Sequence, residues 1–351
     1  MTGTVTVLGA GAMGSALATP LRAAGWRVNL WGTWLDDHLL DACAAGSPHP
    51  RTAVPLADGT RLFYSDRLAD ALDGTDVVII AVASVGVQEV ARRALPGISG
   101  SRALLLTSKG FSPDDDGRVR LLPDALRELG AEHDAELPPI VAVGGPCKAN
   151  EVAAGRWTAT IFGCRDRSVA EESARTLGTA AYRAGTTDDE AGVEICAPMK
   201  NVYAIALGLA DGLGERHEEP FHDLKAATFA QAVRELVILA GLVGGRAETA
   251  TGLAGVGDLE VTGLSGRNKV YGARIGQGES AAGALEAMTA AEQTVEGVPA
   301  ARLAKDLVDQ RDGAAWGELP LLAAVLDVIA GADDPASHVA RAVLPGPPGN
   351  A

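Results

Sequence analysis

One lysine in this sequence stands in apolar surroundings, where a side-chain amine is a candidate for proton transfer. Lys200 and Asn201 interrupt the run GVEICAPMKNVYAIALGLADGLG, whose other members are mostly apolar. A lysine is seldom buried unless it is paired or takes part in chemistry, and a positioned amine can act as a general acid or base. The alternative is a helix lysine whose charged end reaches the surface.

Two further lysines follow predicted strands. ALLLTSKG ends with Lys109 and Gly110, and PIVAVGGPCKANE continues through Gly145 into Cys147 and Lys148. Ligands of open parallel sheets bind at the carboxyl ends of the strands, so these residues are candidates for contact with a substrate. The alternative for each lysine is a solvated loop charge.

A glycine-rich segment carries a third group of polar residues. Within GLAGVGDLEVTGLSGRNKVYG, six glycines surround Asp258, Thr262, Arg267 and Asn268. This composition is too permissive for a plain helix. The arginine and asparagine are a candidate anion clamp, because a guanidinium offers two parallel donors to phosphate oxygens. The alternative is the start of a helix with an exposed arginine.

The amino-terminal motif predicts a dinucleotide site. GAGAMG places Gly9, Gly11 and Gly14 directly after the strand TVTVL and at the start of a helix over 13–24. Gly9 permits a tight turn, Gly11 lets a pyrophosphate approach the backbone, and Gly14 lets the helix pack on the strand. The alternative is a Rossmann-like turn without a ligand.

The end of the second strand bears on the choice of coenzyme. The segment NLWGTWLDDH has no acid at the strand tip, although Asp36 and Asp37 follow soon after. No Arg or Lys follows Trp31 closely to meet a 2′-phosphate. Two acids and no base favour NAD over NADP.

Bulk properties restrict the class of protein. The chain has 351 residues, 47% hydrophobic and 21% charged, which is typical of two globular domains. A net charge of -15 argues against nucleic acid or an anionic membrane as a partner, while a locally basic site still admits a small anion. We expect no signal peptide, no membrane insertion and no metal site, and free thiols at Cys43, Cys147, Cys164 and Cys196 indicate a cytoplasmic protein.

The elements that must position these residues fall into two halves. Apolar runs predict strands over 4–8, 27–31, 76–82, 103–108, 139–144 and 158–163 in a parallel, doubly wound α/β sheet. Helical spacing predicts helices over 193–213, 222–243, 281–291, 297–310 and 318–330. The predicted domains are a Rossmann-type domain over 1–188, an all-helical domain over 189–343 and a disordered tail over 344–351.

Several of these motifs together resemble one family, the cytosolic NAD(P)-dependent glycerol-3-phosphate dehydrogenases. The resemblance runs from Thr4 to about Ala301 and rests on GAGAMGSALA, SKG, GGPCKANE, GVEICAPMKNVYAIALGLADGLG, GLAGVGDLEVTGLSGRN and TVEGVPAA. It implies a Rossmann-type domain, a helical domain, and catalysis in a cleft between them. It also implies reversible hydride transfer between carbon 2 of sn-glycerol 3-phosphate and NAD, with NADP as the other coenzyme, for phospholipid synthesis. We expect a homodimer.

The resemblance also implies roles for individual residues. Lys200 matches the proton-transfer lysine. Desolvation and a nearby Lys109 would lower its pKa towards neutrality, and Asp258 would orient one of the two lysines. Arg267 and Asn268 match a phosphate clamp. The expected catalytic residues are Lys200, Lys109 and Asp258; the substrate-binding residues are Asn201, Thr262, Arg267, Asn268, Gly145, Cys147 and Lys148; and the cofactor-binding residues are Gly9, Gly11, Ala12, Met13, Gly14, Thr33, Trp34, Ala149, Arg267 and Glu296.

The sequence departs from the family pattern beside the expected substrate. Cys147 replaces a small hydroxyl residue, Lys148 replaces an aromatic or similar group, and Ala83 stands where a proline is usual. These changes bear on the substrate more than on the reaction class. One alternative is therefore a sister dehydrogenase of another phosphorylated polyol or a cyclitol phosphate. Another is a non-catalytic NAD sensor, against which the joint retention of Lys109, Lys200, Asp258 and Arg267 speaks.

Overall fold

The chain divides into two compact units. The computed structural model describes residues 3–346. Within them, unit 1 comprises residues 3–112 and 120–194, and unit 2 comprises residues 113–119 and 195–346. Each unit therefore contains two separate stretches of chain.

The predicted division of the chain between residues 188 and 189 stays a prediction. The disordered tail predicted over 344–351 lies outside the described residues from position 347 onward. The described helices end with α16 at Val343.

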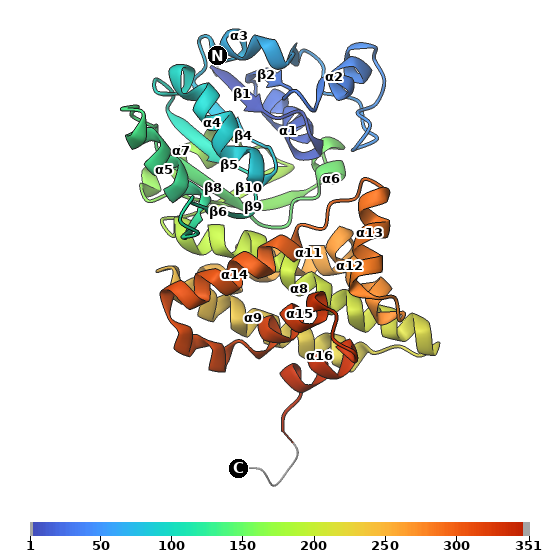
Figure 1. The fold of residues 1–351 in the computed structure, drawn as a ribbon. Helices are drawn as coiled ribbons and strands as arrows, with labels where there is room; N and C mark the ends of the chain where they lie inside the picture. Colours follow the sequence, from blue (N-terminus) through green and yellow to red (C-terminus); the bar gives the residue numbers. More distant parts are fainter. Residues whose placement is uncertain (1–2, 347–351) are drawn as a thin grey trace. The chain divides into compact units, whose positions relative to one another are not determined.

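Unit 1 is built on an eight-stranded sheet with the order β10-β9-β8-β5-β4-β1-β2-β3 (Figure 1). Six strands run parallel, while β9 and β10 are parallel to each other and antiparallel to β8. The strands are β1 (Thr4–Leu8), β2 (Arg27–Trp31), β3 (Arg61–Phe63), β4 (Val77–Ile80), β5 (Ala103–Leu106), β8 (Ile140–Gly144), β9 (Thr158–Gly163) and β10 (Tyr182–Thr187). The predicted Rossmann-type sheet is confirmed, except that its last two strands reverse direction.

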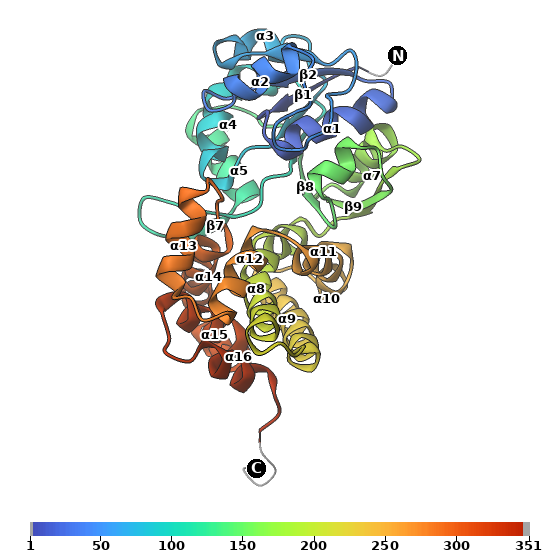
Figure 2. The ribbon, with the colours of Figure 1, turned by 90° about the vertical axis from the view of Figure 1, so that its right-hand side faces the viewer.

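Helices cover both faces of this sheet, as the continuous apolar strands require. Along β1, Val5 and Val7 pack in the same core cluster as Leu17 of α1, whereas Leu8 packs in a second cluster with Val87 of α4. Figure 2 shows α1 and α4 on opposite sides of the strands. The helices are α1 (Ala12–Ala23), α2 (Asp37–Ala44), α3 (Leu68–Leu72), α4 (Ser84–Ile98), α5 (Leu122–Glu132), α6 (Ala149–Ala153) and α7 (Arg167–Leu177), with a 3₁₀ turn at Ser65–Arg67.

A short two-stranded ribbon joins the two units in sequence. It consists of β6 (Phe111–Pro113) and β7 (Val119–Leu121). The segment 113–119, which runs from the last residue of β6 to the first residue of β7, belongs to unit 2. There the side chain of Gln310 accepts a hydrogen bond from Val119 N at 2.9 Å and donates one to Gly117 O at 2.8 Å.

Unit 2 is helical, as predicted, and α8 runs between α9 and α12 (Figure 2). The most apolar 18-residue window of α8 is long enough to cross a membrane, but it is entirely buried, as the core helix of a soluble protein is. The elements are α8 (Glu190–His217), α9 (His222–Leu242), α10 (Ala247–Thr251), a π-helical turn (Leu253–Gly257), α11 (Asp258–Leu264), α12 (Arg267–Gly276), α13 (Ala281–Ala290), α14 (Gly297–Arg311), a 3₁₀ turn (Gly313–Glu318), α15 (Pro320–Ala330) and α16 (Pro335–Val343).

The glycine-rich segment is not one plain helix, as its composition predicts, although most of it is helical. A π turn, α11 and α12 follow one another, and only the short link at Ser265 and Gly266 separates the last two. The reason is that several glycines serve close packing instead of chain flexibility. A Cβ atom on Gly263, for example, would lie 2.9 Å from Leu207 Cδ1 of α8.

Helices α8 and α12 cross in direct backbone contact. A Cβ atom on Gly208 or Gly212 of α8 would lie 2.0 or 1.9 Å from carbonyl oxygens of α12. A Cβ atom on Gly272 or Gly276 of α12 would lie 1.9 or 2.3 Å from carbonyl oxygens of α8. Each helix thus presents two glycines four residues apart, on one face. This crossing fixes the start of α12 relative to α8.

A buried carboxylate ties three helices of unit 2 together. Glu235 of α9 is fully buried and accepts hydrogen bonds from Leu321 N at 2.6 Å and Leu322 N at 2.8 Å, at the start of α15. It also accepts a bond from the hydroxyl of Tyr203 in α8 at 2.9 Å. Burial raises the pKa of Glu235 against the effect of these donors. The carboxylate satisfies amides that the first turn of a helix leaves without partners.

Candidate active site

The lysine singled out in the sequence forms a buried ion pair. Lys200 lies in the middle of α8 and is 7% exposed, and its ammonium contacts the carboxylate of Asp258, the first residue of α11. Asp258 is fully buried. The carboxylate offsets the cost of desolvating the ammonium and fixes the direction in which its protons point. The hydroxyl of Thr262, one turn later, donates a hydrogen bond to Asp258 O at 2.6 Å, so Thr262 lies beside the ion pair in the same helix.

Residues of three helices meet around Glu296, which directly precedes α14. Asn201, next to Lys200, lies 3.3 Å from one oxygen of the Glu296 carboxylate, and Arg267 lies 3.4 Å from the other. Asn268 accepts a hydrogen bond from Gly297 N at 2.8 Å through its side-chain oxygen. Unit 2 thus brings five predicted residues, at positions 200, 201, 258, 267 and 268, onto adjoining helix ends and faces.

The first turn of α12 is suited to an anion. Gly266 precedes the helix without a side-chain cap, and Arg267 and Asn268 are its first two residues. The side chain of Arg267 is 49% exposed. The bond from Gly297 N occupies the oxygen of the Asn268 amide, so its NH₂ group is left as donor. A helix N-terminus with an arginine and an amide donor attracts a phosphate group.

In unit 1 the glycine motif forms the turn that a dinucleotide site requires, and we call its residues 9–14 the glycine cradle. Gly9 has a φ of 115°, which an L side chain rarely adopts, and a Cβ atom on Gly14 would lie 2.0 Å from Gly9 O. Above Gly11, in contrast, the space is open: among the described residues, and apart from its chain neighbours, only Arg51 Nη1 lies within 4 Å of a Cβ atom there, at 3.6 Å. Ala12 and Met13 begin α1 without a side-chain cap. These features fit a dinucleotide pyrophosphate.

The two acids after the second strand do not have the role expected of them. Asp36 is buried, and its carboxylate accepts bonds from Ala10 N at 3.2 Å and from the backbone and hydroxyl of Thr33 at 3.0 and 2.9 Å. Asp37 accepts bonds from Ser65. The argument for NAD from these acids therefore loses its basis, and the preference for NAD over NADP stays a prediction.

Trp34, another predicted cofactor residue, is 45% exposed beyond the second strand. The guanidinium of Arg93 in α4 lies 4.3 Å from the centre of its ring. An exposed aromatic face beside Thr33, at the carboxyl end of β2, is a surface on which a planar ring can stack.

Four predicted residues of unit 1 line one small pocket at the carboxyl ends of β5 and β8. They are Met13, Lys109, Gly145 and Cys147. The pocket also contains Tyr182 of β10, which the sequence interpretation missed. Burial and the neighbouring Cys147 raise the pKa of Tyr182, so its hydroxyl is neutral.

Lys148 and Ala149 lie just outside this pocket. Lys148 precedes α6, and Ala149 is the first residue of that helix. Neither lines the pocket that contains Lys109. A role for Lys148 in substrate binding therefore stays a prediction.

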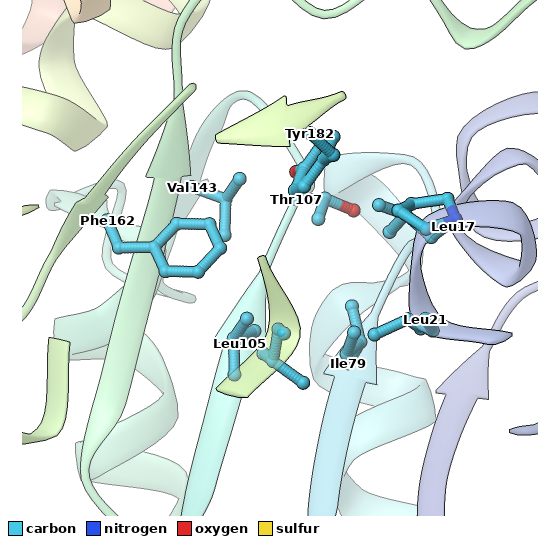
Figure 3. A pocket seen from close by; sticks show the side chains of 10 residues that line it. Leu17, Leu21, Ile79, Leu105, Thr107, Val143, Phe162 and Tyr182 are labelled. Carbon is cyan, nitrogen blue, oxygen red and sulfur yellow. The ribbon is translucent and has the colours of Figure 1, made fainter. Parts of the chain in front are cut away.

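A second cavity of unit 1, shown in Figure 3, is a gap in the core with no charged lining. It is lined mainly by apolar side chains, and the hydroxyl-bearing Thr107 and Tyr182 complete the lining. A mostly apolar gap of this kind is a packing feature.

The carboxyl group of Glu194 is also absent from the predicted set. Glu194 is 2% exposed, and within residues 3–346 its Oε2 atom has no hydrogen-bond partner. Burial and the nearby Glu190 raise its pKa well above the usual range, against the effect of Lys109. The signal in the sequence was the same as for Lys200, a single charge in the run GVEICAPM.

His49 contacts the glycine cradle, and the sequence interpretation missed it as well. It is 1% exposed, and its Nε2 atom lies 2.9 Å from Ala10 O. Arg51 N donates to Nδ1 at 3.2 Å. Because Nδ1 accepts, the proton of the neutral ring is on Nε2, which donates to Ala10 O. Burial lowers the pKa of His49, as does Arg51, while the bond to Ala10 and the charge of Asp36 oppose this.

We expect acid to destabilise unit 1 through His49. Its pKa is lower in the folded than in the unfolded protein, so its contribution to stability is present above pH about 6.5 and is lost as the pH falls through the folded pKa. The free energy of unfolding, measured with urea from pH 7.5 to pH 5, should therefore fall more steeply in the wild type than in His49→Gln. Equal slopes would contradict this role for His49.

A glycine cradle on a Rossmann-type sheet and a buried lysine in a helical unit define an oxidoreductase that uses a nicotinamide dinucleotide. Comparison with known proteins identifies the particular family. Family models described as the N-terminus and C-terminus of NAD-dependent glycerol-3-phosphate dehydrogenase match residues 4–170 and 189–340. The chain belongs to this family and is an NAD(P)-dependent oxidoreductase.

Relatives match over most of their length. The NADP(+)-dependent glycerol-3-phosphate dehydrogenase of Archaeoglobus fulgidus is 36% identical over 80% of this chain and 82% of its own. The glycerol-3-phosphate dehydrogenase [NAD(P)+] of Rhodospirillum rubrum is 31% identical over 95% and 90%. The crystal structure of glycerol-3-phosphate dehydrogenase from Coxiella burnetii superposes with a TM-score of 0.81, at 29% identity, over 97% of this chain and 98% of that one.

Proposed function

We propose that this enzyme interconverts dihydroxyacetone phosphate and sn-glycerol 3-phosphate, with Lys200 as the group that moves the proton. The observation that carries this assignment is the buried pair of Lys200 and Asp258. When bound, the coenzyme supplies or takes the hydride. The protein must then supply a proton to the ketone oxygen, or remove one from the alcohol.

Lys200 can perform both directions of this proton transfer. In reduction its ammonium donates a proton to the oxygen on which negative charge develops. In oxidation the neutral amine accepts the proton of the secondary alcohol. Asp258 keeps the side chain in place throughout, because the carboxylate contacts the ammonium and is itself fully buried. Lys109 lines the pocket of unit 1, and its action on the substrate beside Lys200 stays a prediction.

The substrate phosphate is proposed to bind at the start of α12. Arg267 supplies charge and two parallel donors, Asn268 supplies its NH₂ group, and the helix supplies the backbone amides of its first turn. Glu296 is 3.4 Å from Arg267 and holds its side chain near the helix end.

Arg267→Gln is expected to raise KM for dihydroxyacetone phosphate about ten- to a hundredfold, because a charge-assisted pair of hydrogen bonds is lost. Steady-state kinetics at saturating coenzyme measures this. Arg274→Gln is the matched control, because Arg274 lies on the same helix and pairs with Glu279. An equal rise in KM in both variants would show that the charge of the helix, and not a phosphate contact, is responsible.

A sister dehydrogenase of another phosphorylated polyol is the second candidate, favoured by the presence of Cys147 beside Lys109 in the pocket of unit 1. A panel of phosphorylated ketoses, each assayed with NADH and NADPH, separates the two. Turnover of dihydroxyacetone phosphate far below that of another member of the panel would overturn the first candidate. Absence of turnover with every member would favour the NAD sensor.

The working state is proposed to be a cytoplasmic homodimer. Free cysteines at positions 43, 147, 164 and 196 are in keeping with a reducing compartment. Two large apolar side chains of unit 2, Leu264 and Val270, are exposed around the start of α12, and exposed apolar groups favour association. Light scattering during size-exclusion chromatography tests the oligomeric state.

A further inference from the structure

A loop of unit 1 forms an additional wall of the glycine cradle. It covers residues 45–60, between α2 and β3, and its buried His49 donates a hydrogen bond to Ala10 O, as described above. Ala10 N is held from the other side by the carboxylate of Asp36, at 3.2 Å. The residue between the first two glycines of the motif is thus fixed through both its backbone groups.

The same contact sets the position of Arg51. Arg51 N donates to Nδ1 of His49, so the backbone of Arg51 is tied, through one imidazole ring, to the backbone of Ala10. Its side chain then extends over the next residue of the motif, and Nη1 lies 3.6 Å from where a Cβ atom of Gly11 would be. Apart from the chain neighbours of Gly11, no other described heavy atom comes within 4 Å of that point.

The guanidinium of Arg51 is exposed and has no hydrogen-bond or ion-pair partner within residues 3–346. The carboxylate of Asp36, which contacts the motif at Ala10, is already shared among three donors from Ala10 and Thr33. His49, tied to both residues, is neutral when its Nδ1 accepts. The local charge above Gly11 is therefore positive, although the whole chain carries -15.

We propose that Arg51 binds a phosphate group of the dinucleotide, with His49 as the residue that positions it. The inference rests on the proposed function, because it takes the glycine cradle as the coenzyme site. Two phosphate groups have the required chemistry: the pyrophosphate, which NAD and NADP share, and the 2′-phosphate, which only NADP carries. A guanidinium binds either one through two parallel hydrogen bonds.

The experiment is isothermal titration calorimetry of the intact enzyme with NADH and, separately, with NADPH. Arg51→Gln removes the charge, and Arg51→Lys keeps the charge but loses the two parallel donors. Arg102→Gln is the charge-matched control. Arg102 directly precedes β5, at the amino edge of the sheet and so opposite the motif, and it forms an exposed ion pair with Asp76, whose loss has little effect on stability.

Arg51→Gln is expected to raise Kd about ten- to a hundredfold, Arg51→Lys by less, and Arg102→Gln not at all. An equal rise for both coenzymes identifies the pyrophosphate as the ligand, and a rise larger for NADPH identifies the 2′-phosphate. Unchanged Kd values in Arg51→Gln, or a rise for NADH alone, would overturn the proposal.

The same titrations distinguish a failure of the proposed function from a failure of the proposal for Arg51. If the wild-type enzyme bound neither coenzyme, the assignment of the cradle would fall, and the proposal for Arg51 with it. If the wild type bound both and Arg51→Gln bound both equally well, only the role of Arg51 would fall. Circular dichroism of each variant establishes that a change in Kd does not arise from unfolding.

Discussion

Lys200→Met is expected to lower kcat for dihydroxyacetone phosphate about a thousandfold while the Kd of NADH stays unchanged. Methionine keeps the length and apolar stem of the side chain but can neither donate nor accept the proton, and a positioned acid or base contributes about 10²- to 10⁴-fold to a rate. The coenzyme cradle lies in unit 1 and does not include Lys200. Single-turnover kinetics and calorimetric titration measure the two quantities.

The ion pair requires a control for stability. Lys200→Met removes the ammonium that contacts the fully buried carboxylate of Asp258, and breaking a buried ion pair from one side costs about 3–5 kcal/mol of unfolding free energy. The double variant Lys200→Met/Asp258→Asn removes both charges and should regain most of that stability, yet it should remain inactive. Recovery of activity together with stability would show that Lys200 serves only to hold the fold.

Gly272→Ala is expected to reduce the free energy of unfolding by about 3 kcal/mol or more, because overpacking at a helix contact forces backbone shifts. The new methyl group would lie 1.9 Å from Ile205 O and 2.8 Å from the carbon of the same carbonyl group. Backbone atoms cannot move aside as a flexible side chain can, so α12 must move away from α8. KM for dihydroxyacetone phosphate should rise as well, since Arg267 and Asn268 begin α12.

Gly241→Ala provides the comparison for this substitution. Gly241 lies in α9, and apart from its chain neighbours and the backbone of its own helix, no heavy atom of residues 3–346 comes within 4 Å of a Cβ atom there. The same change should therefore stabilise the protein by about 0.5–1 kcal/mol, through the lower entropy of the unfolded chain and the better helix propensity of alanine. Urea unfolding of both variants measures the contrast. Similar values for the two would contradict the backbone contact between α8 and α12.

The sequence predicts elements well where one periodic signal dominates. The strands over 4–8, 27–31 and 158–163 were located to the residue because each is a short apolar run between turns. β3 and β10 were missed, since RLF is too short and YRAGTT too polar to give such a signal. The reversal of β9 against β8 was missed too, because pairing direction depends on distant contacts.

In the candidate site, too, the residues that could be predicted are those with a local signal in the sequence. Gly9, Lys200 and Asp258 could be named because each belongs to a local motif or an isolated charge in an apolar run. Tyr182 and Arg51 could not, because what brings them to the site is a strand pairing and a hydrogen bond to His49. The role of the glycines in α12 was also hidden, since their function depends on the facing helix and not on their own segment.

The segment 113–119 has a consequence for how the chain acquires its structure. Gly117 and Val119 bond to Gln310, which lies 193 and 191 residues further along the chain. These contacts cannot form during synthesis until α14 has left the ribosome, so this part of unit 2 must wait until after all of unit 1 has been synthesised. A fragment that begins at residue 189 would lack the segment altogether, and the amide of Gln310 would lose both of its backbone partners. Residues from 189 onward therefore do not contain the whole of unit 2.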